Sequence, residues 1–177
     1  MDKHIHSNDL VEINNLCEKL IQIFQDEEGL YLELIKKEDL KKAAILERNT
    51  ENLLKISREQ EDSLKMVDLR EKERTDIIRQ ISQFYRPAIN FEKISEIADL
   101  PRLPYHMKEK LLHHSYALRE LMFTLKNITN INQEMLEDNK RLFDSLIEEL
   151  IDDRDNTYGP AARNKQSSGP LFINLNG

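Results

Sequence analysis

Prolines and glycines, the residues that most often end helices, are almost absent from the first half of this chain. Residues 1–86 contain no proline and one glycine, Gly29. Across that stretch apolar residues recur at spacings of three and four, which fits the 3.6-residue period of an α-helix and not the two-residue period of a strand. A second stretch, residues 105–152, repeats the pattern. These spacings predict an all-α fold: an elongated antiparallel bundle of three long helices, a helical hairpin plus a third long helix, with a flexible C-terminal tail.

The charge and composition of the chain argue against several kinds of partner. The formal net charge is −7, and affinity for nucleic acid comes from Lys and Arg side chains that neutralise phosphates, so no nucleic-acid partner is expected. There is no run of 18 apolar residues and no apolar core of signal-peptide length at the start, so we expect a cytoplasmic protein without membrane insertion. Cys17 is the only cysteine, which excludes a disulfide within one chain and suits a small buried apolar side chain.

Two sets of apolar positions divide the first stretch of the chain. The first set runs from Leu10 to Leu34, and the same spacing continued along the chain would next reach Glu38, Lys41, Ile45 and Arg48. The apolar residues of the second set are offset from these positions by one residue. A turn near Lys36–Asp39 is the simplest explanation, and one continuous helix with an irregular step is the alternative. The predicted boundaries are helices over about 8–36, 39–86 and 105–152, a linker over 87–104, a single domain over 1–153 and a tail over 154–177.

Polar residues interrupt the apolar stripes of the first two helices. The stripe of the first helix consists of Leu10, Ile13, Cys17, Leu20, Phe24, Glu27, Tyr31 and Leu34. Its one charged member is Glu27. The stripe of the second helix is polar in its middle, at Ser57, Gln60, Glu71 and Arg74. We interpret these positions as solvated gaps in a thin core; the alternative is that they specify the register of the helices or face a partner.

The last third of the third helix carries two apolar stripes. The first continues the stripe of that helix through Met135, Leu142 and Leu146. The second consists of Leu136, Phe143, Ile147, Leu150 and Ile151. Two stripes on one helix imply two partners or one broad partner. The first two helices can cover one stripe, which leaves the other for a second copy of the chain, the tail or a client protein.

The composition changes after residue 153. The segment DNTYGPAARNKQSSGP is rich in turn-forming and polar residues and predicts a flexible tail. Its end, PLFINLNG, is too apolar for a freely solvated segment because of Leu171, Phe172, Ile173 and Leu175. We expect these four residues to fold back onto the second stripe of the third helix. The alternative is a terminus without a role.

No group of residues predicts an enzyme, a cofactor site or a metal site. His4 and His6 lack a fixed third ligand, and a zinc ion normally needs three or four. His113 and His114 are adjacent, so on a helix their side chains point about 100° apart. The four glycines are far apart and form no phosphate-binding loop. Long amphipathic helices without catalytic residues are typical of proteins that bind other proteins.

The layout of the chain resembles the FlgN-type flagellar export chaperones. The first helix ends in LYLELIKKEDL, similar to the acidic helix end of that family, and the next block contains the family-like Arg74. A proline-containing linker follows. The block LRELMFTLKNITNINQEMLEDNKRLFDSLIEELI is similar to the last helix of the family, including Asn132 and Asn139 within its apolar run. Thr157–Pro160 (TYGP) resembles the Tyr-Gly signature that closes this helix, whereas PLFINLNG matches no family feature.

The resemblance implies a cytoplasmic type III flagellar export chaperone. Such a protein would bind hook-associated proteins, which join hook to filament, prevent their premature assembly and deliver them to the flagellar export gate. The resemblance implies that the last helix binds the helical terminal segment of the client and that Tyr158 docks to the gate. The expected client-binding residues are Met135, Leu136, Leu142, Phe143, Leu146, Ile147, Leu150 and Ile151.

Two other functions remain open at the level of sequence. The chain could be a structural coiled-coil protein that self-associates, for example as a homodimer, which predicts an apolar stripe that continues evenly along the second and third helices. It could instead be an export chaperone for another flagellar substrate, the filament cap protein or flagellin. The uneven stripe of the second helix favours a client-binding protein over a self-associating one.

Overall fold

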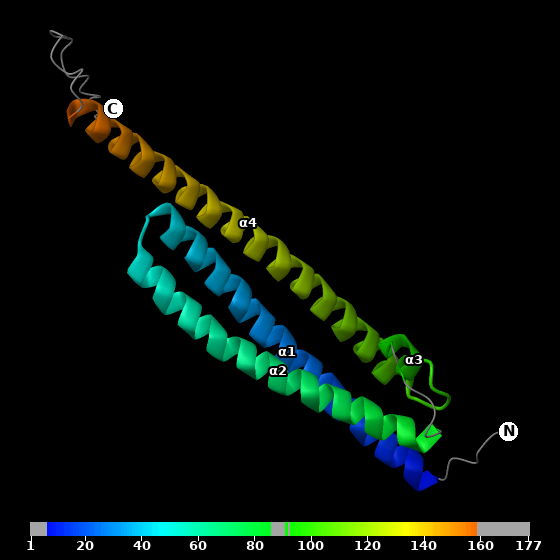
Figure 1. The fold of residues 1–177 in the computed structure, drawn as a ribbon. Helices are drawn as coiled ribbons and strands as arrows, with labels where there is room; N and C mark the ends of the chain where they lie inside the picture. Colours follow the sequence, from blue (N-terminus) through cyan, green and yellow to red (C-terminus); the bar gives the residue numbers. More distant parts are fainter. Residues whose placement is uncertain (1–6, 86–90, 92, 159–177) are drawn as a thin grey trace. The chain divides into compact units, whose positions relative to one another are not determined.

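The computed structural model describes residues 7–85, 91 and 93–158, and of residues 7, 85, 150 and 152–158 the backbone alone. Four helices follow one another along the chain: α1 (Ser7–Leu46), α2 (Thr50–Tyr85), α3 (Ile94–Ala98) and α4 (Tyr105–Tyr158) (Figure 1). No strand occurs among these described residues, and the long helices pack together. The predicted all-α helical bundle is therefore confirmed.

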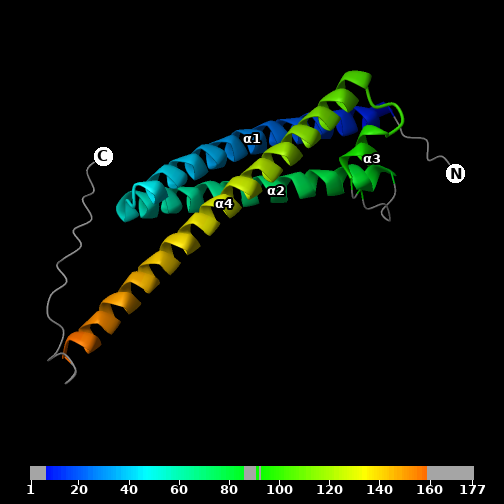
Figure 2. The ribbon, with the colours of Figure 1, turned by 90° about the horizontal axis from the view of Figure 1, so that it is seen from above.

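The chain divides into two compact units, Met1–Met135 and Leu136–Gly177, and α4 contributes to both. The first unit contains α1, α2, α3 and the first part of α4. Within it, α1 and α2 form an antiparallel hairpin and lie side by side in both ribbon views (Figures 1 and 2). That residues 1–153 form a single domain stays a prediction.

The hairpin turn lies about ten residues later than the sequence predicts. We predicted a turn near Lys36–Asp39, with helices over 8–36 and 39–86, and this is wrong: α1 continues to Leu46 and α2 begins at Thr50. The stripe of α1 extends through Glu38 and Ile45, which are both buried. A break at residues 36–39 would have removed these side chains from the interface with α2, so the helix continues.

A turn without glycine or proline connects α1 to α2. Arg48 adopts the left-handed conformation with φ 55°, and its N–H donates to the carbonyl of Ile45 at 3.1 Å while that of Asn49 donates to Ala44 at 2.9 Å. This pair of bonds is a Schellman motif, which usually has glycine at the left-handed position. The side chain of Asn49 caps α2 by accepting the N–H of Asn52 at 3.0 Å. Sequence reasoning missed the turn because arginine takes the place of glycine.

The last helix is also longer than predicted. We predicted residues 105–152 as helix and 154–177 as tail, but α4 extends to Tyr158, so the predicted tail is wrong over residues 154–158. No glycine or proline occurs between residue 105 and residue 158, and Gly159-Pro160 is the first pair that opposes helix continuation. Residues 159–177 lie outside the described part of the chain.

One apolar cluster closes the end of the first unit at which α1 begins, α2 ends and α4 begins. Its members come from all four helices and the segment after α3: Ile13, Leu16, Cys17, Leu20, Ile21, Phe24, Ile81, Ile97, Leu100, Leu103, Met107, Leu111 and Leu118. The linker residues Ile97, Leu100 and Leu103 are buried in this cluster, so the linker packs over this end of the first unit. Cys17 is fully buried, and burial raises the pKa of its thiol to about 11. A neutral, apolar role fits this cysteine.

A buried polar cluster joins α1, α2 and α4 farther along the first unit. The carboxylate of Glu38 accepts hydrogen bonds from Gln60 Nε2 at 2.8 Å, Asn132 Nδ2 at 2.6 Å and Lys41 Nζ at 3.2 Å. Asn132 Nδ2 also donates to the Glu38 backbone carbonyl at 2.8 Å. Burial alone would raise the pKa of Glu38, but the hydrogen bonds from Gln60, Asn132 and Lys41 outweigh it and lower the pKa below its ordinary value. Glu38 is therefore a buried carboxylate that needs all three partners.

A second buried charge lies on the α1–α2 interface. Glu27 is 1% exposed and its Oε2 pairs with Arg74 Nη1 at 3.2 Å. The guanidinium of Arg74 also lies 5.8 Å from the ring centre of Phe24 and pairs with the exposed Glu71 at 3.3 Å. We interpreted Gln60 and Arg74 as solvated gaps, which is wrong. They are the partners of Glu38 and Glu27, the two acidic positions in the stripe of α1, and the alternative interpretation, that they specify register, fits this pairing.

Replacing Asn132 by alanine is expected to lower the free energy of unfolding by about 1–2 kcal/mol. The variant removes both hydrogen bonds to Glu38, and hydrogen bonds to a charged group contribute roughly 1.5–3 kcal/mol. The loss is reduced because the buried Oδ1 of Asn132, which has no partner among the described residues, is removed as well. Urea denaturation followed by circular dichroism measures the change.

Asn139→Ala is the matched control, since Asn139 lies seven residues farther along the same stripe of α4 and is half-buried. We expect its free energy of unfolding to stay within about 0.5 kcal/mol of the native value. Equal losses in the two variants would contradict a specific role for the bonds between Asn132 and Glu38.

Candidate functional site

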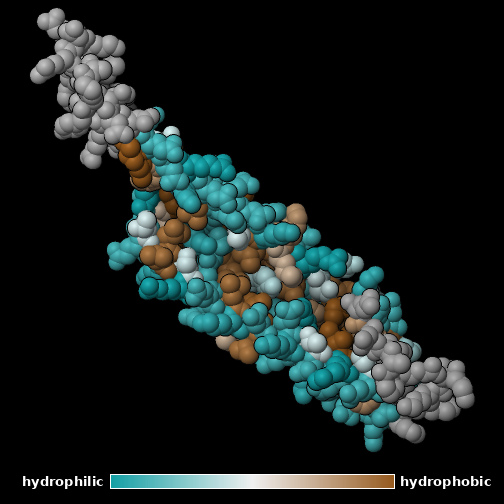
Figure 3. All heavy atoms as spheres, viewed as in Figure 1, coloured by the Kyte–Doolittle hydropathy of each residue, from teal (hydrophilic) through white to brown (hydrophobic). Residues whose placement is uncertain are grey.

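The second unit exposes a series of large apolar side chains along α4. They are between 39% and 55% exposed: Leu136, Leu142, Phe143, Leu146, Ile147 and Ile151. Apolar surface is visible along the last described turns of α4 in Figure 3. Six such side chains on four helical turns form a contiguous patch rather than the scattered exposure that is normal on protein surfaces. We call these six residues the apolar face.

The apolar face occupies one side of the helix. At 100° per residue its members fall within about 180° of the circumference, from Leu142 at one edge to Ile151 at the other. The half-buried Asn139 falls inside this arc, and Lys140 falls near the Ile151 edge. A face this wide is broader than the stripe of a two-stranded coiled coil, and suits a partner that contacts both stripes at once.

Acidic residues border the apolar face on both edges. Asp144 and Glu148 follow the Ile151 edge, Asp138 and Glu149 follow the Leu142 edge, and all four are exposed. Residues 136–151 contain five acidic and two basic residues. One of the basic residues, Arg141, lies on the opposite side and pairs with Asp138 at 3.5 Å and with Glu137 at 3.9 Å. The negative charge at the edges favours a partner with Lys or Arg beside its own apolar residues.

The remaining predicted site residues have different positions. Met135 is half-buried and is the last residue of the first unit. Leu150 is part of α4, but its side chain is outside the described part of the structure, as is that of Tyr158, the last residue of α4. Leu171, Phe172, Ile173 and Leu175 lie outside the described residues altogether.

Sequence reasoning missed a second exposed row on α4, in the first unit. Tyr105, Tyr116 and Phe123 are 73%, 62% and 61% exposed. Their spacings of eleven and seven residues place them on one side of the helix, roughly opposite the buried Leu111 and Leu118. The signal was present in the sequence as an aromatic repeat on the polar side of the helix.

A histidine also connects α4 to α1. His114 Nδ1 lies 2.8 Å from Glu28 Oε1, and its Nε2 lies 3.2 Å from Gln25 Nε2. It contacts the ring of His113 edge-on, with ring centres 5.3 Å apart. Among the described residues no group of three metal-ligating side chains comes together.

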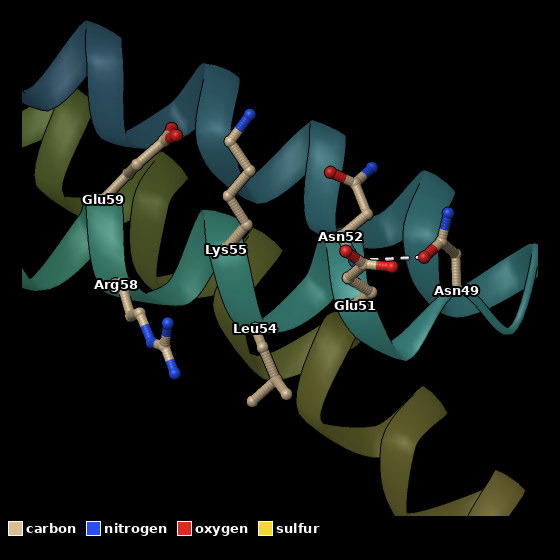
Figure 4. Close-up of a pocket in the computed structure, with 7 residues that line it drawn as sticks. All are labelled: Asn49, Glu51, Asn52, Leu54, Lys55, Arg58 and Glu59. Carbon is tan, nitrogen blue, oxygen red and sulfur yellow. Dashed lines mark hydrogen bonds between the residues drawn. The ribbon is translucent and has the colours of Figure 1, made fainter.

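A surface depression lies at the tip of the hairpin (Figure 4). Its lining is mostly polar and charged: Asn49, Glu51, Asn52, Leu54, Lys55, Arg58 and Glu59. In Figure 4 Leu54 and Arg58 point away from α1, and Asn49 is engaged in capping α2. Leu54 is the one apolar residue type in this lining, whereas a small-molecule site is lined predominantly by apolar and aromatic residues. The apolar face therefore remains the candidate site.

Comparison with known proteins identifies the family. The profile of the FlgN family, described as FlgN protein, matches residues 16–166 and so covers most of the chain, including parts of both compact units. No curated protein and no solved structure gives a significant match. Within the described residues, no helix is both long enough and apolar enough to cross a membrane. Long packed helices, an exposed apolar face on α4 and the match over residues 16–166 lead to one conclusion: the chain belongs to the FlgN family of flagellar export chaperones.

Proposed function

We propose that this protein is a cytoplasmic chaperone for hook-associated proteins, and that the apolar face of α4 binds the helical terminal segment of the client. The observation that carries the proposal is the exposure of six large apolar side chains on one side of α4. Helices that expose such a face bind amphipathic helices, whose anchors recur at i, i+3 or i+4, and i+7.

Binding would protect the client by covering its apolar stripe. Each residue of the apolar face is roughly half exposed, so its complete burial contributes on the order of 1 kcal/mol. A client helix covered in this way could not pair with the neighbouring subunits that it contacts in the assembled flagellum. Premature assembly is then prevented by competition for the same stripe of the client.

The acidic edges of the apolar face define the chemistry of the client segment. A helix with Lys or Arg on both sides of its apolar stripe would place positive charge beside Asp144, Glu148 and Glu149. Exposed charges act mainly on the rate of association and on specificity, and salt screens them over about 8 Å at physiological ionic strength. We therefore expect client binding to weaken as salt is added.

The first unit anchors the part of α4 that precedes the apolar face. Asn132, bonded to Glu38 of α1, lies four residues before Leu136, where the face begins. Within the first unit, the cluster around Glu38 thus bonds α4 to α1. Delivery to the export gate is proposed for the residues around Tyr158, at the end of α4.

Titrating the full chain with synthetic peptides tests the proposal. We expect the terminal helical segment of a hook-associated protein to bind with one-to-one stoichiometry, and at least about tenfold more tightly than the corresponding segments of the cap protein or flagellin. A tenfold difference is about 1.4 kcal/mol. Isothermal titration calorimetry at low and physiological salt measures affinity and its salt dependence.

Tighter binding of the cap or flagellin peptide would contradict the proposed client class and favour the alternative substrates. Absence of binding by every peptide, together with a stable dimer in sedimentation, would instead favour self-association through the same face.

A further inference from the structure

We propose that residues 171–175 of this chain cover the apolar face of α4 when no client is bound, and so regulate access to it. The regulatory part of this inference rests on the proposed function, because it assumes a client that competes for the face. The contact itself does not depend on the identity of the client. The face lies in the second compact unit, and the covering segment follows it in the chain.

The chemistry of the segment is complementary to that of the face. Leu171, Phe172, Ile173 and Leu175 supply apolar side chains at close spacing, and the face offers apolar surface that solvent would otherwise cover. Residues 159–177 contain two basic residues, Arg163 and Lys165, and no acidic one. Their charge is opposite to that of the acidic edges of the face.

The length of the connecting segment matches the distance to the face. Twelve residues, 159–170, separate the end of α4 at Tyr158 from Leu171. A random coil of this length spans about 17–21 Å. Ile147 lies eleven residues before Tyr158 and Phe143 fifteen, which correspond to about 17 Å and 22 Å along the helix axis. A segment that reverses direction after α4 would therefore reach the middle of the face without being stretched.

The connecting segment also has the residues that a reversal requires. Gly-Pro pairs occur at its beginning, Gly159-Pro160, and at its end, Gly169-Pro170. These pairs favour turns over continued helix. A covalent connection of this length gives the covering segment an effective concentration in the millimolar range, so even a weak contact would compete with a client.

Hydrogen–deuterium exchange on the full chain tests the contact directly. We expect Phe172→Asp to increase the exchange rate of amides in residues 142–151 several-fold relative to the native chain, because the cover is lost. Asn174→Asp is the matched control, because it adds the same charge to the same segment without removing an apolar side chain. In this variant the amide exchange rates of residues 142–151 should stay close to those of the native chain. Unchanged exchange in Phe172→Asp would overturn the proposal.

A second measurement separates this proposal from the proposed function. If both hold, Phe172→Asp should bind the client peptide about three- to tenfold more tightly than the native chain does, since a competitor is removed. If no peptide binds but the exchange rate still rises in Phe172→Asp, the cover stands and the proposed function fails. If residues 142–151 stay protected from exchange in Phe172→Asp, and this protection increases with protein concentration, a second copy of the chain covers the apolar face. That result would overturn the proposal.

Discussion

Arg74→Met is expected to lower the free energy of unfolding by about 2–4 kcal/mol, the largest effect on stability of any single change considered for the hairpin. Glu27 is 1% exposed, and the guanidinium of Arg74 lies 3.2 Å from its carboxylate. Removing one partner of a buried ion pair leaves an uncompensated buried charge, which costs roughly 3–5 kcal/mol. We place the expected value lower because Arg74 itself is 23% exposed, so water can solvate part of the site.

The same substitution one turn earlier is a matched control. Arg70 pairs with Asp26 at 3.5 Å and with Glu73 at 2.6 Å, and all three side chains are at least 33% exposed. Surface ion pairs of this kind contribute about 0–1 kcal/mol. Urea denaturation of Arg70→Met and Arg74→Met at the same pH compares the two directly. Similar losses in the free energy of unfolding would show that the ion pair between Glu27 and Arg74 stabilises the protein no more than a surface ion pair does.

The effect of Arg74→Met should also depend on pH. Burial raises the pKa of Glu27, with Arg74 lowering it and Glu71 raising it further, and the net shift is upward. When folding raises the pKa of a carboxyl group, the group stabilises the protein at pH values below its pKa in the unfolded chain, near 4.5. That stabilisation is lost as the pH rises through the pKa of the group in the folded protein. Without Arg74 the charged form is disfavoured still more. The difference between Arg74→Met and the native chain should therefore be large at pH 7 and shrink towards pH 4.

A double variant separates the pair from its packing. Glu27→Gln combined with Arg74→Met removes the buried charge along with its partner, and should recover more than half of the stability lost in Arg74→Met. No recovery would mean that the loss comes from the contact between Arg74 and the ring of Phe24, and not from the buried charge.

The helices and most buried positions could be predicted from spacing alone. In the stripe of α1, Ile13, Cys17, Leu20, Phe24 and Leu34 are all buried as expected. Burial of one side of a helix requires apolar residues at those spacings, so the pattern and the structure have the same cause. The stripe of α2 was less well predicted. Glu71, a predicted position of this stripe, is exposed, whereas Ile56 and Ser63, which are outside the predicted stripe, are buried.

The turn and the buried polar pairs could not be predicted, for two different physical reasons. The turn depends on a left-handed conformation at Arg48, which costs about 1–2 kcal/mol for a residue other than glycine and has no sequence signature. The pairs of Glu27 with Arg74 and of Glu38 with Gln60 depend on the register of two helices. Moving the turn by ten residues changes every such pairing, so an error in the turn also concealed the partners.

The candidate site was predicted as a set of residues, but its context was not. The wide arc of apolar residues between Leu136 and Ile151 follows from helical geometry once the helix is known to be continuous. The acidic edges can be recognised only when Asp144, Glu148 and Glu149 are placed around the helix next to that arc. Which molecule covers the face is a property of the partner, and helix periodicity in one chain contains no information on it.

Phe143→Asp is expected to weaken binding of the client peptide by about 100-fold or more. Phe143 is 54% exposed and lies near the centre of the apolar face, where a large aromatic side chain contributes most to an interface. The variant loses the burial of an aromatic ring and places a carboxylate in the contact. A 100-fold change corresponds to about 2.7 kcal/mol, which is in the range observed for such central residues.

Ser145→Asp is the matched control for this variant. Ser145 is exposed and lies on the opposite side of α4, two residues along, so the same charge is added to the same helix outside the apolar face. We expect its affinity for the peptide to stay within about threefold of the native value, and both variants to keep the free energy of unfolding of the hairpin within about 0.5 kcal/mol. Equal weakening by the two substitutions would mean that charge on α4 in general, and not the apolar face, governs binding. Native affinity in Phe143→Asp would place the client on another surface, for which the row of Tyr105, Tyr116 and Phe123 is the next candidate.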